Sequence, residues 1–190
     1  MKVIILCGGL GTRLSEETKT KPKPMVKIGT QPIIWHLIKY YQSYGFNDFI
    51  LATGYKSNEI KKYFENIKIK NLNIQLVYTG KNTLTGGRIL RLKKYIFDDE
   101  FLMTYGDGLS NINLKKLVSF HRSRKSVVTL TAVRPPVRFG EIKISNKGIV
   151  NEFKEKPQSS KNWINGGFFV MNKDIFNYLK KMSLLHWQNL

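Results

Sequence analysis

Cysteine is almost absent from this chain, whose 190 residues include only one, Cys7. A single cysteine excludes an intramolecular disulfide framework and a cysteine-cluster metal site. Long apolar runs are missing too, because nothing approaches the roughly 20 apolar residues of a membrane-spanning helix. The apolar start of the chain stops after residue 7 at a glycine, unlike a signal peptide. Together these absences predict a soluble, cytoplasmic protein.

Acidic side chains are scarce as well, with 13 Asp and Glu against 32 Lys and Arg, giving a net charge of +19. The lysines are spread over most of the chain, and no recognition helix, zinc module or motif of stacking aromatics accompanies them. We interpret the excess as a basic surface suited to anionic substrates. Nucleic-acid binding is the alternative. A hydrophobic content of 42% excludes general disorder and can supply the core of one domain.

The most informative pattern lies in the first 25 residues. An apolar run at residues 3–7 is followed by Gly8, Gly9 and Gly11, and then by Arg13 and Lys23. An apolar run bounded by glycine predicts a buried parallel strand. The glycines expose backbone N–H groups at its end, and the two cations can neutralise a polyanion there. The pattern predicts a triphosphate site, and a simple connecting turn is the alternative.

Other well-known catalytic motifs are absent. A dinucleotide-binding loop would read G-x-G-x-x-G with an acidic residue about 20 positions later, whereas residues 18–27 contain lysines and no acid. A P-loop and a G-x-S-x-G nucleophile elbow are also missing. The histidines at 36, 121 and 186 form no catalytic set. Displacement at phosphorus needs none of these, because it proceeds by positioning and charge neutralisation.

Helical and strand-like segments alternate along the chain. Predicted helices cover residues 32–44, 57–65, 88–95 and the region around 114–121. Predicted strands cover residues 3–7, 49–53, 74–78, 101–105 and 127–133. This alternation predicts an α/β fold with a Rossmann-like, mostly parallel sheet and helices on both faces. Beyond it, short strands at 141–144 and 149–154 flank a turn at 146–148, and a buried strand covers 168–171.

Asp107 ends a predicted strand between two glycines, at the edge where open α/β sheets place their ligands. A carboxylate beside a triphosphate is a suitable Mg²⁺ ligand, because magnesium takes one or two carboxylates together with phosphate oxygens. An aspartate that merely caps the next helix is the alternative.

These motifs together resemble those of the sugar-1-phosphate nucleotidyltransferases, the enzymes that make NDP-sugars. The first motif is Gly-Gly-x-Gly-Thr-Arg-Leu with Lys-Pro-x-Pro. Further segments resemble the glucose-1-phosphate cytidylyltransferases in particular: residues 15–18, 34–36, 85–88, 104–108 and 165–170. The resemblance implies one domain over residues 1–190 with the nucleotide-diphospho-sugar transferase fold. Residues 1–125 would form its nucleotide-binding half and residues 126–190 its sugar-binding half.

The resemblance also implies roles for individual residues. Catalytic roles fall to Arg13, Lys23 and Asp107, and Asp107 would carry Mg²⁺. Contacts to the nucleotide fall to Leu6, Gly8, Gly9, Gly11, Thr12, Arg13, Thr83, Arg88 and Gly106. Contacts to the sugar phosphate fall to Gly140, Glu155, Lys156, Asn165 and Gly166. The alternatives are a solvated helix arginine for Arg88 and a plain surface pair for Glu155 and Lys156.

The implied reaction transfers a cytidylyl group from CTP to α-D-glucose 1-phosphate, giving CDP-glucose and pyrophosphate for deoxysugar and surface-polysaccharide synthesis. The same chemistry with UTP or dTTP is the runner-up, and a homo-oligomer is expected for the complete enzyme. The chain stops at Leu190, whereas such enzymes continue and supply a second metal-binding aspartate. We therefore expect this chain to lack a C-terminal part, and a nucleotide-binding module without turnover is a further alternative.

Overall fold

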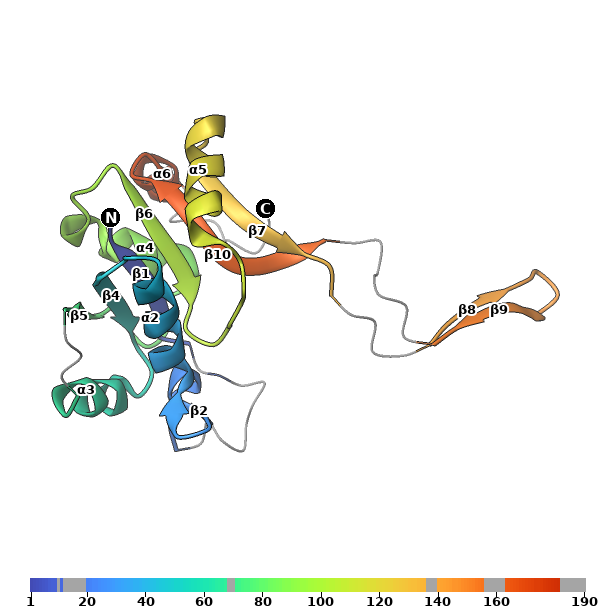
Figure 1. The fold of residues 1–190 in the computed structure, drawn as a ribbon, viewed down its shortest axis with the longest axis horizontal. Helices are drawn as coiled ribbons and strands as arrows, with labels where there is room; N and C mark the ends of the chain where they lie inside the picture. Colours follow the sequence, from blue (N-terminus) through green and yellow to red (C-terminus); the bar gives the residue numbers. More distant parts are fainter. Residues whose placement is uncertain (10, 12–19, 68–70, 136–139, 156–162, 182–190) are drawn as a thin grey trace. The chain divides into compact units, whose positions relative to one another are not determined.

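The computed structural model describes residues 1–9, 11, 20–67, 71–135, 140–155 and 163–181 (Figure 1). The chain forms two compact units. The first combines Met1–Thr129 with the chain from Phe168 onward, and the second is Leu130–Gly167.

A six-stranded sheet runs in the order β5-β4-β1-β6-β10-β7. Its strands are β1 Val3–Cys7, β4 Asp48–Thr53, β5 Asn73–Tyr78, β6 Glu100–Tyr105, β7 Val128–Val133 and β10 Ile164–Asn172. β5, β4, β1 and β6 are parallel neighbours, which confirms the mostly parallel sheet, and β10 pairs antiparallel with β6. The parallel strands therefore end at a common edge, where β1 gives way to the glycines and β6 to Asp107.

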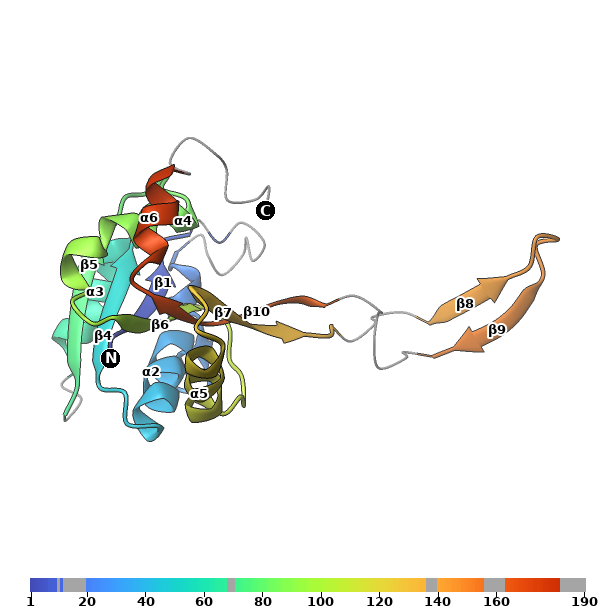
Figure 2. The same cartoon turned by 90° about the horizontal axis from the view of Figure 1, so that it is seen from above.

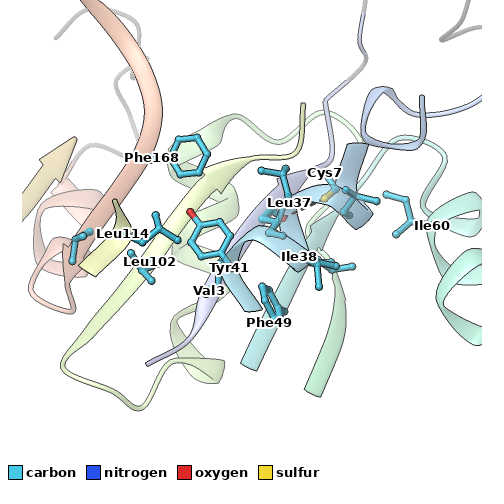
Figure 3. Packing of buried hydrophobic residues seen from close by; sticks show 14 of the residues in the cluster. Val3, Cys7, Leu37, Ile38, Tyr41, Phe49, Ile60, Leu102, Leu114 and Phe168 are labelled. Carbon is cyan, nitrogen blue, oxygen red and sulfur yellow. Dashed lines mark hydrogen bonds between the residues drawn. The ribbon is translucent and has the colours of Figure 1, made fainter. Parts of the chain in front are cut away.

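Each face of the sheet carries its own hydrophobic core, because successive side chains of a strand point to opposite faces. On β1, Val3 and Ile5 pack into one cluster and Ile4 into the other. The first cluster includes Tyr41 and Phe168, whose rings stack with centroids 6.0 Å apart (Figure 3). Helices α2 (Ile33–Ser43) and α5 (Leu114–Arg124) cover this side of the sheet. Helices α4 (Thr85–Arg91) and α6 (Ile175–Lys181) cover the other side (Figure 2). The sheet with helices on both faces is as predicted.

The helices of the first unit agree with the predicted segments except at two places. Three match closely: α2 Ile33–Ser43, α3 Ser57–Glu65 and α5 Leu114–Arg124. The predicted basic helix is divided in two, since α4 covers Thr85–Arg91 and a short 3-10 helix, η3, covers Lys93–Tyr95. The sequence prediction omitted α6 Ile175–Lys181, and also three short elements after the glycines: η2 Lys23–Met25, β2 Lys27–Ile28 and β3 Gln31–Pro32.

The second unit contains the predicted hairpin, formed by β8 Glu141–Ile144 and β9 Val150–Lys154. Gly148 has φ +77 in the connecting turn, a conformation that glycine adopts without strain. Charged residues of the two strands pair on one face, where Glu152 contacts both Lys143 and Lys154. Among the residues described in both units, no helix is long and apolar enough to cross a membrane.

Candidate nucleotide site

A cavity of about 550 Å³ lies at the carboxyl ends of β1 and β6 in the first unit. Parallel α/β sheets bind their ligands at this edge. The cavity is lined by Leu6, Cys7, Gly8, Gly9, Gly11, Lys23, Pro24, Lys81, Asn82, Thr83, Leu84, Thr85, Arg88, Tyr105, Gly106 and Asp107. The structure thus brings together three segments that the sequence analysis selected separately: the glycines, the Lys-Pro-x-Pro turn and the Gly-Asp-Gly strand end.

Gly106 allows two of these segments to touch. A Cβ at this position would lie 2.8 Å from Cγ of Pro24 and 2.9 Å from the carbonyl oxygen of Leu6. The buried Pro24 belongs to η2, which holds Lys23 at the mouth of the cavity. Only glycine leaves room for the Lys-Pro-x-Pro turn to pack against the end of β6.

Lys23 and Asp107, which both line the cavity, form an ion pair. Their side chains are 27% and 32% exposed, so a ligand can reach both. The turn of η2 supplies the cation and the end of β6 the carboxylate. An arriving phosphate group can compete for the lysine and leave the carboxylate to a cation, which suits a site for a metal-bound polyphosphate.

The donor set of the cavity fits one class of metal ion. Among the residues that the structure describes, no three His, Cys, Asp or Glu side chains come together as a metal cage. Asp107 is the acidic side chain among the described lining residues. One carboxylate suits Mg²⁺, which takes its other ligands from phosphate oxygens and water, and does not suit a metal held by protein ligands alone.

Arg88 lies beneath the glycines, with only 5% of its surface exposed. Nη2 donates to the carbonyl oxygen of Gly8 at 2.7 Å and to that of Lys81 at 3.2 Å. Nη1 donates to the carbonyl of Thr53 at 3.3 Å, the hydroxyl of Thr79 at 2.8 Å and the carbonyl of Gly80 at 2.7 Å. The alternative of a solvated helix arginine is therefore wrong. Burial lowers the pKa of this guanidinium, which nevertheless stays charged.

Thr83 is held at the cavity by a second arginine. Arg91, one turn after Arg88 on α4, donates to the hydroxyl of Thr83 at 2.8 Å and also to the carbonyl of Thr79. The two arginines thus fix the segment between β5 and α4, where Lys81 and Asn82 also line the cavity. Lys81 adds a cation to the lining that was not among the predicted site residues.

Cys7 lines the cavity but is not a nucleophile. It is buried at the end of β1, and burial together with the nearby charge of Asp107 raises the pKa of its thiol. A raised pKa keeps the sulfur protonated and unreactive at neutral pH. This agrees with a site that works by binding and charge rather than by covalent catalysis.

The residues predicted to bind the sugar phosphate lie in the second unit. Glu155 approaches Gly140, where a Cβ would lie 3.2 Å from Oε2 of Glu155 and 2.7 Å from the ring of Phe153. The side chain of Asn165 accepts a hydrogen bond from the backbone of Gly167 at 2.8 Å. Gly166 packs closely against the backbone of residue 131. Lys156, like Thr12 and Arg13, lies outside the described residues.

Comparison with known proteins identifies the family. The family model described as Nucleotidyl transferase matches residues 2–188. The chain belongs to this family. It is 44% identical to the glucose-1-phosphate cytidylyltransferase of Salmonella typhimurium, over 94% of this chain and 78% of that protein. The chain is therefore a nucleotidyltransferase that is shorter than these relatives.

Solved structures agree with the observed fold. HddC from Yersinia pseudotuberculosis, solved in complex with GMP-PN, is 30% identical with a TM-score of 0.70, covering 92% of this chain and 78% of that one. A putative glucose-1-phosphate thymidylyltransferase from Bacillus anthracis, in complex with a sucrose, is 22% identical with a TM-score of 0.75, covering 96% and 75%. The latter supports the fold alone, and the predicted nucleotide-diphospho-sugar transferase fold is confirmed.

Gly54 is a structural residue of this nucleotidyltransferase that the sequence analysis missed. It follows β4, and a Cβ there would lie 2.6 Å from Nη1 of Arg88, 2.6 Å from the carbonyl of Gly80 and 2.8 Å from that of Gly8. A glycine directly after a predicted parallel strand was a visible signal. What it packs against was not, because Arg88 is distant in the sequence.

Proposed function

We propose that this nucleotidyltransferase transfers a cytidylyl group from CTP to α-D-glucose 1-phosphate, releasing CDP-glucose and pyrophosphate. The observation that carries the proposal is the single cavity that combines Gly8, Gly9 and Gly11 with Lys23 and Asp107. The 44% identity to a glucose-1-phosphate cytidylyltransferase supports the choice of base and sugar. A role in deoxysugar and surface-polysaccharide synthesis, the cytoplasmic location and a homo-oligomeric state stay predictions.

In the proposed reaction, an oxygen of the sugar phosphate attacks the α-phosphorus of CTP. A new phosphorus–oxygen bond forms there, and the bond from the α-phosphorus to the bridging oxygen of the β-phosphate breaks. The electron pair of that bond leaves with pyrophosphate. Backbone N–H groups of the glycines would hold the β- and γ-phosphates together with Arg13.

Lys23 would stabilise the charge that builds up on the phosphate oxygens during displacement. A cation about 4 Å from a phosphate oxygen contributes about 4 kcal/mol at an effective dielectric near 20. A few such groups account for much of a catalytic effect without a protein nucleophile. The buried, protonated thiol of Cys7 is consistent with this.

Asp107 would hold Mg²⁺ when the nucleotide is bound. A bound Mg²⁺ would supply positive charge that neutralises the phosphates. The protein's part is to keep a carboxylate at the end of β6, next to the lysine with which it pairs in this structure. Thr83, fixed by Arg91, would contact the nucleotide from the opposite segment of the cavity.

The sugar phosphate would be bound by Gly140, Glu155, Lys156, Asn165 and Gly166. Glutamate can accept hydrogen bonds from sugar hydroxyls, and lysine can hold the phosphate. The closeness of Glu155 to Gly140 within the second unit supports a shared role for these two residues.

A panel of nucleoside triphosphates tests the proposal. CTP, UTP, dTTP, GTP and ATP would each be incubated with glucose 1-phosphate and Mg²⁺, and pyrophosphate release would be measured. We expect the highest kcat/KM with CTP. A preference for UTP or dTTP would overturn the cytidylyl assignment and leave the family intact. Nucleotide binding without pyrophosphate release from any triphosphate would favour the alternative of a binding module.

A further inference from the structure

One guanidinium joins the turns that follow three neighbouring strands. β5, β4 and β1 are adjacent in the sheet, and the chain leaves them at Tyr78, Thr53 and Cys7. Arg88 binds the carbonyl oxygens of Gly8, Thr53 and Gly80 at these three exits. Its planar, five-donor group can satisfy acceptors on several sides at once, which the single ammonium of lysine cannot.

The hydrogen bond to Gly8 has a consequence for the neighbouring residue. A peptide group is planar and trans, so its C=O and its N–H point in opposite directions. When the carbonyl of Gly8 points at the guanidinium, the N–H of Gly9 points away from it. Gly9 is exposed and lines the cavity. Arg88 at 2.7 Å, together with the backbone N–H of Tyr55 at 3.3 Å, therefore holds this carbonyl and sets which way the N–H of Gly9 faces.

The space around the guanidinium is closely filled. A Cβ at Gly8 would overlap Cζ and both terminal nitrogens of Arg88. A Cβ at Gly54 would collide with Nη1 and also with two backbone carbonyls. By contrast, a Cβ at Gly9 would have nothing within 4 Å. A residue larger than glycine at position 8 or 54 would therefore displace the arginine. The arginine sets no such limit on the size of residue 9.

We propose that Arg88 is a positioning residue, which fixes the Gly8–Gly9 peptide and thereby sets the phosphate affinity of the cavity. The inference rests on the proposed phosphate site and needs neither the base nor the sugar. It is separate from the sequence-based prediction that Arg88 contacts the nucleotide itself, which stays a prediction.

Pyrophosphate is the probe that separates these two roles, because it has phosphates and no base. Its affinity in the presence of Mg²⁺ would be measured by calorimetry for the wild type and for Arg88→Lys. This variant keeps the positive charge but loses the planar, five-donor guanidinium. We expect Arg88→Lys to bind pyrophosphate about tenfold more weakly, as misplaced binding groups do. The KM for the nucleotide should rise, while the KM for the sugar phosphate stays within about twofold.

A double-mutant cycle tests the contact itself. In the wild type, Gly8→Ala should displace the guanidinium and weaken pyrophosphate binding. In the Arg88→Lys background, where the space is free, the same substitution should weaken pyrophosphate binding by less than about twofold further. Gly54→Ala should reduce the pyrophosphate affinity by the same factor in the wild type and in Arg88→Lys, because the carbonyls of Gly8 and Gly80 still block its Cβ. Gly108→Ala, whose Cβ has nothing within 4 Å and which does not line the cavity, serves as the matched control and should be additive with Arg88→Lys.

The outcomes decide between the roles. Unchanged pyrophosphate affinity in Arg88→Lys, with a raised KM for the nucleotide, would show a direct base contact and overturn the proposal. Full additivity of Gly8→Ala and Arg88→Lys would also overturn it. If Arg88→Lys fails to fold by circular dichroism, Gly8→Ala alone must still weaken pyrophosphate binding, and wild-type affinity there would refute the inference. Failure of the cytidylyl assignment in the triphosphate panel would leave all these pyrophosphate measurements valid.

Discussion

Lys23 and Asp107 are bound to each other in this structure, yet the proposed reaction gives them different tasks. The lysine would act on phosphate oxygens directly, whereas the carboxylate would act through a metal ion. The pair also balances charge while the cavity holds no polyanion, which avoids leaving a half-buried carboxylate without a partner.

We predict that the two residues differ in their response to Mg²⁺. Lys23→Ala removes a cation that matters more as phosphate charge redistributes, so kcat should fall by about 100-fold or more. Asp107→Asn keeps the shape but weakens the metal site, so activity should fall and partly recover at high Mg²⁺ concentration. Steady-state kinetics over a Mg²⁺ titration measures both effects.

The control for these variants is the fold, monitored by thermal unfolding, which both should retain because the two side chains are partly exposed. If the activity of Lys23→Ala also recovered at high Mg²⁺, the assignment of different roles to the two residues would be wrong. If both variants had activity within a few-fold of the wild type, the reaction would not take place at this ion pair.

At the scale of elements, the junction between η2 and β6 determines the position of the ion pair. Pro24 packs against Gly106, and the backbone N–H of Gly106 bonds to the carbonyl of Leu6 at 2.9 Å. The Lys-Pro-x-Pro turn and the Gly-Asp-Gly strand end are therefore one structural feature. Moving the turn would separate Lys23 from Asp107.

We predict that Gly106→Ala destabilises this junction. Its Cβ would lie 2.8 Å from Pro24 and 2.9 Å from a backbone oxygen that cannot move freely. Overpacking of this kind costs about 1–3 kcal/mol of unfolding free energy. Gly108→Ala is the matched control, since its Cβ has nothing within 4 Å. Urea unfolding of both variants measures the difference, and equal midpoints would show that the junction tolerates a methyl group.

Most helices and strands of the first unit could be predicted from sequence because their apolar periodicity is strong. The break between α4 and η3 could not, since residues 88–95 contain no glycine or proline that would mark it. Gly86 and Gly87 lie in the first turn of α4, where Gly87 packs against the methyl group of Thr83. The antiparallel pairing of β10 with β6 was also missed, because strand partners depend on long-range contacts.

The lining of the candidate site was predicted better than the roles of its members. Glycines, Lys23 and Asp107 are visible as motifs, and the structure collects them in one cavity. The burial of Arg88 was not visible, because it depends on the carbonyls of Gly8 and Thr53, 80 and 35 positions away. Sequence patterns locate chemistry-bearing residues, but they do not show which of them is covered by distant loops.

The whole molecule carries a net charge of +19, and the sequence motifs do not explain what this charge does. We predict that it raises the encounter rate with anionic substrates. Raising NaCl from about 0.1 M to about 1 M shortens the Debye length from about 10 Å to about 3 Å and removes such steering. The KM for CTP should therefore rise several-fold while kcat changes little, because groups in direct contact with phosphate are screened less.

Surface lysines away from the cavity provide the matched control for this charge effect. Lys115 and Lys116 are exposed on the first turn of α5, and neither lines the cavity. Replacing both with Gln should flatten the salt dependence of kcat/KM slightly and leave kcat unchanged, because steering depends on total charge. Nucleic-acid binding predicts a different result, in which duplex DNA or RNA binds tightly with a steep salt dependence and competes with CTP. Such competition at 0.15 M salt, measured by fluorescence anisotropy at about micromolar nucleic acid, would show that the basic surface has a macromolecular partner rather than a role in substrate capture.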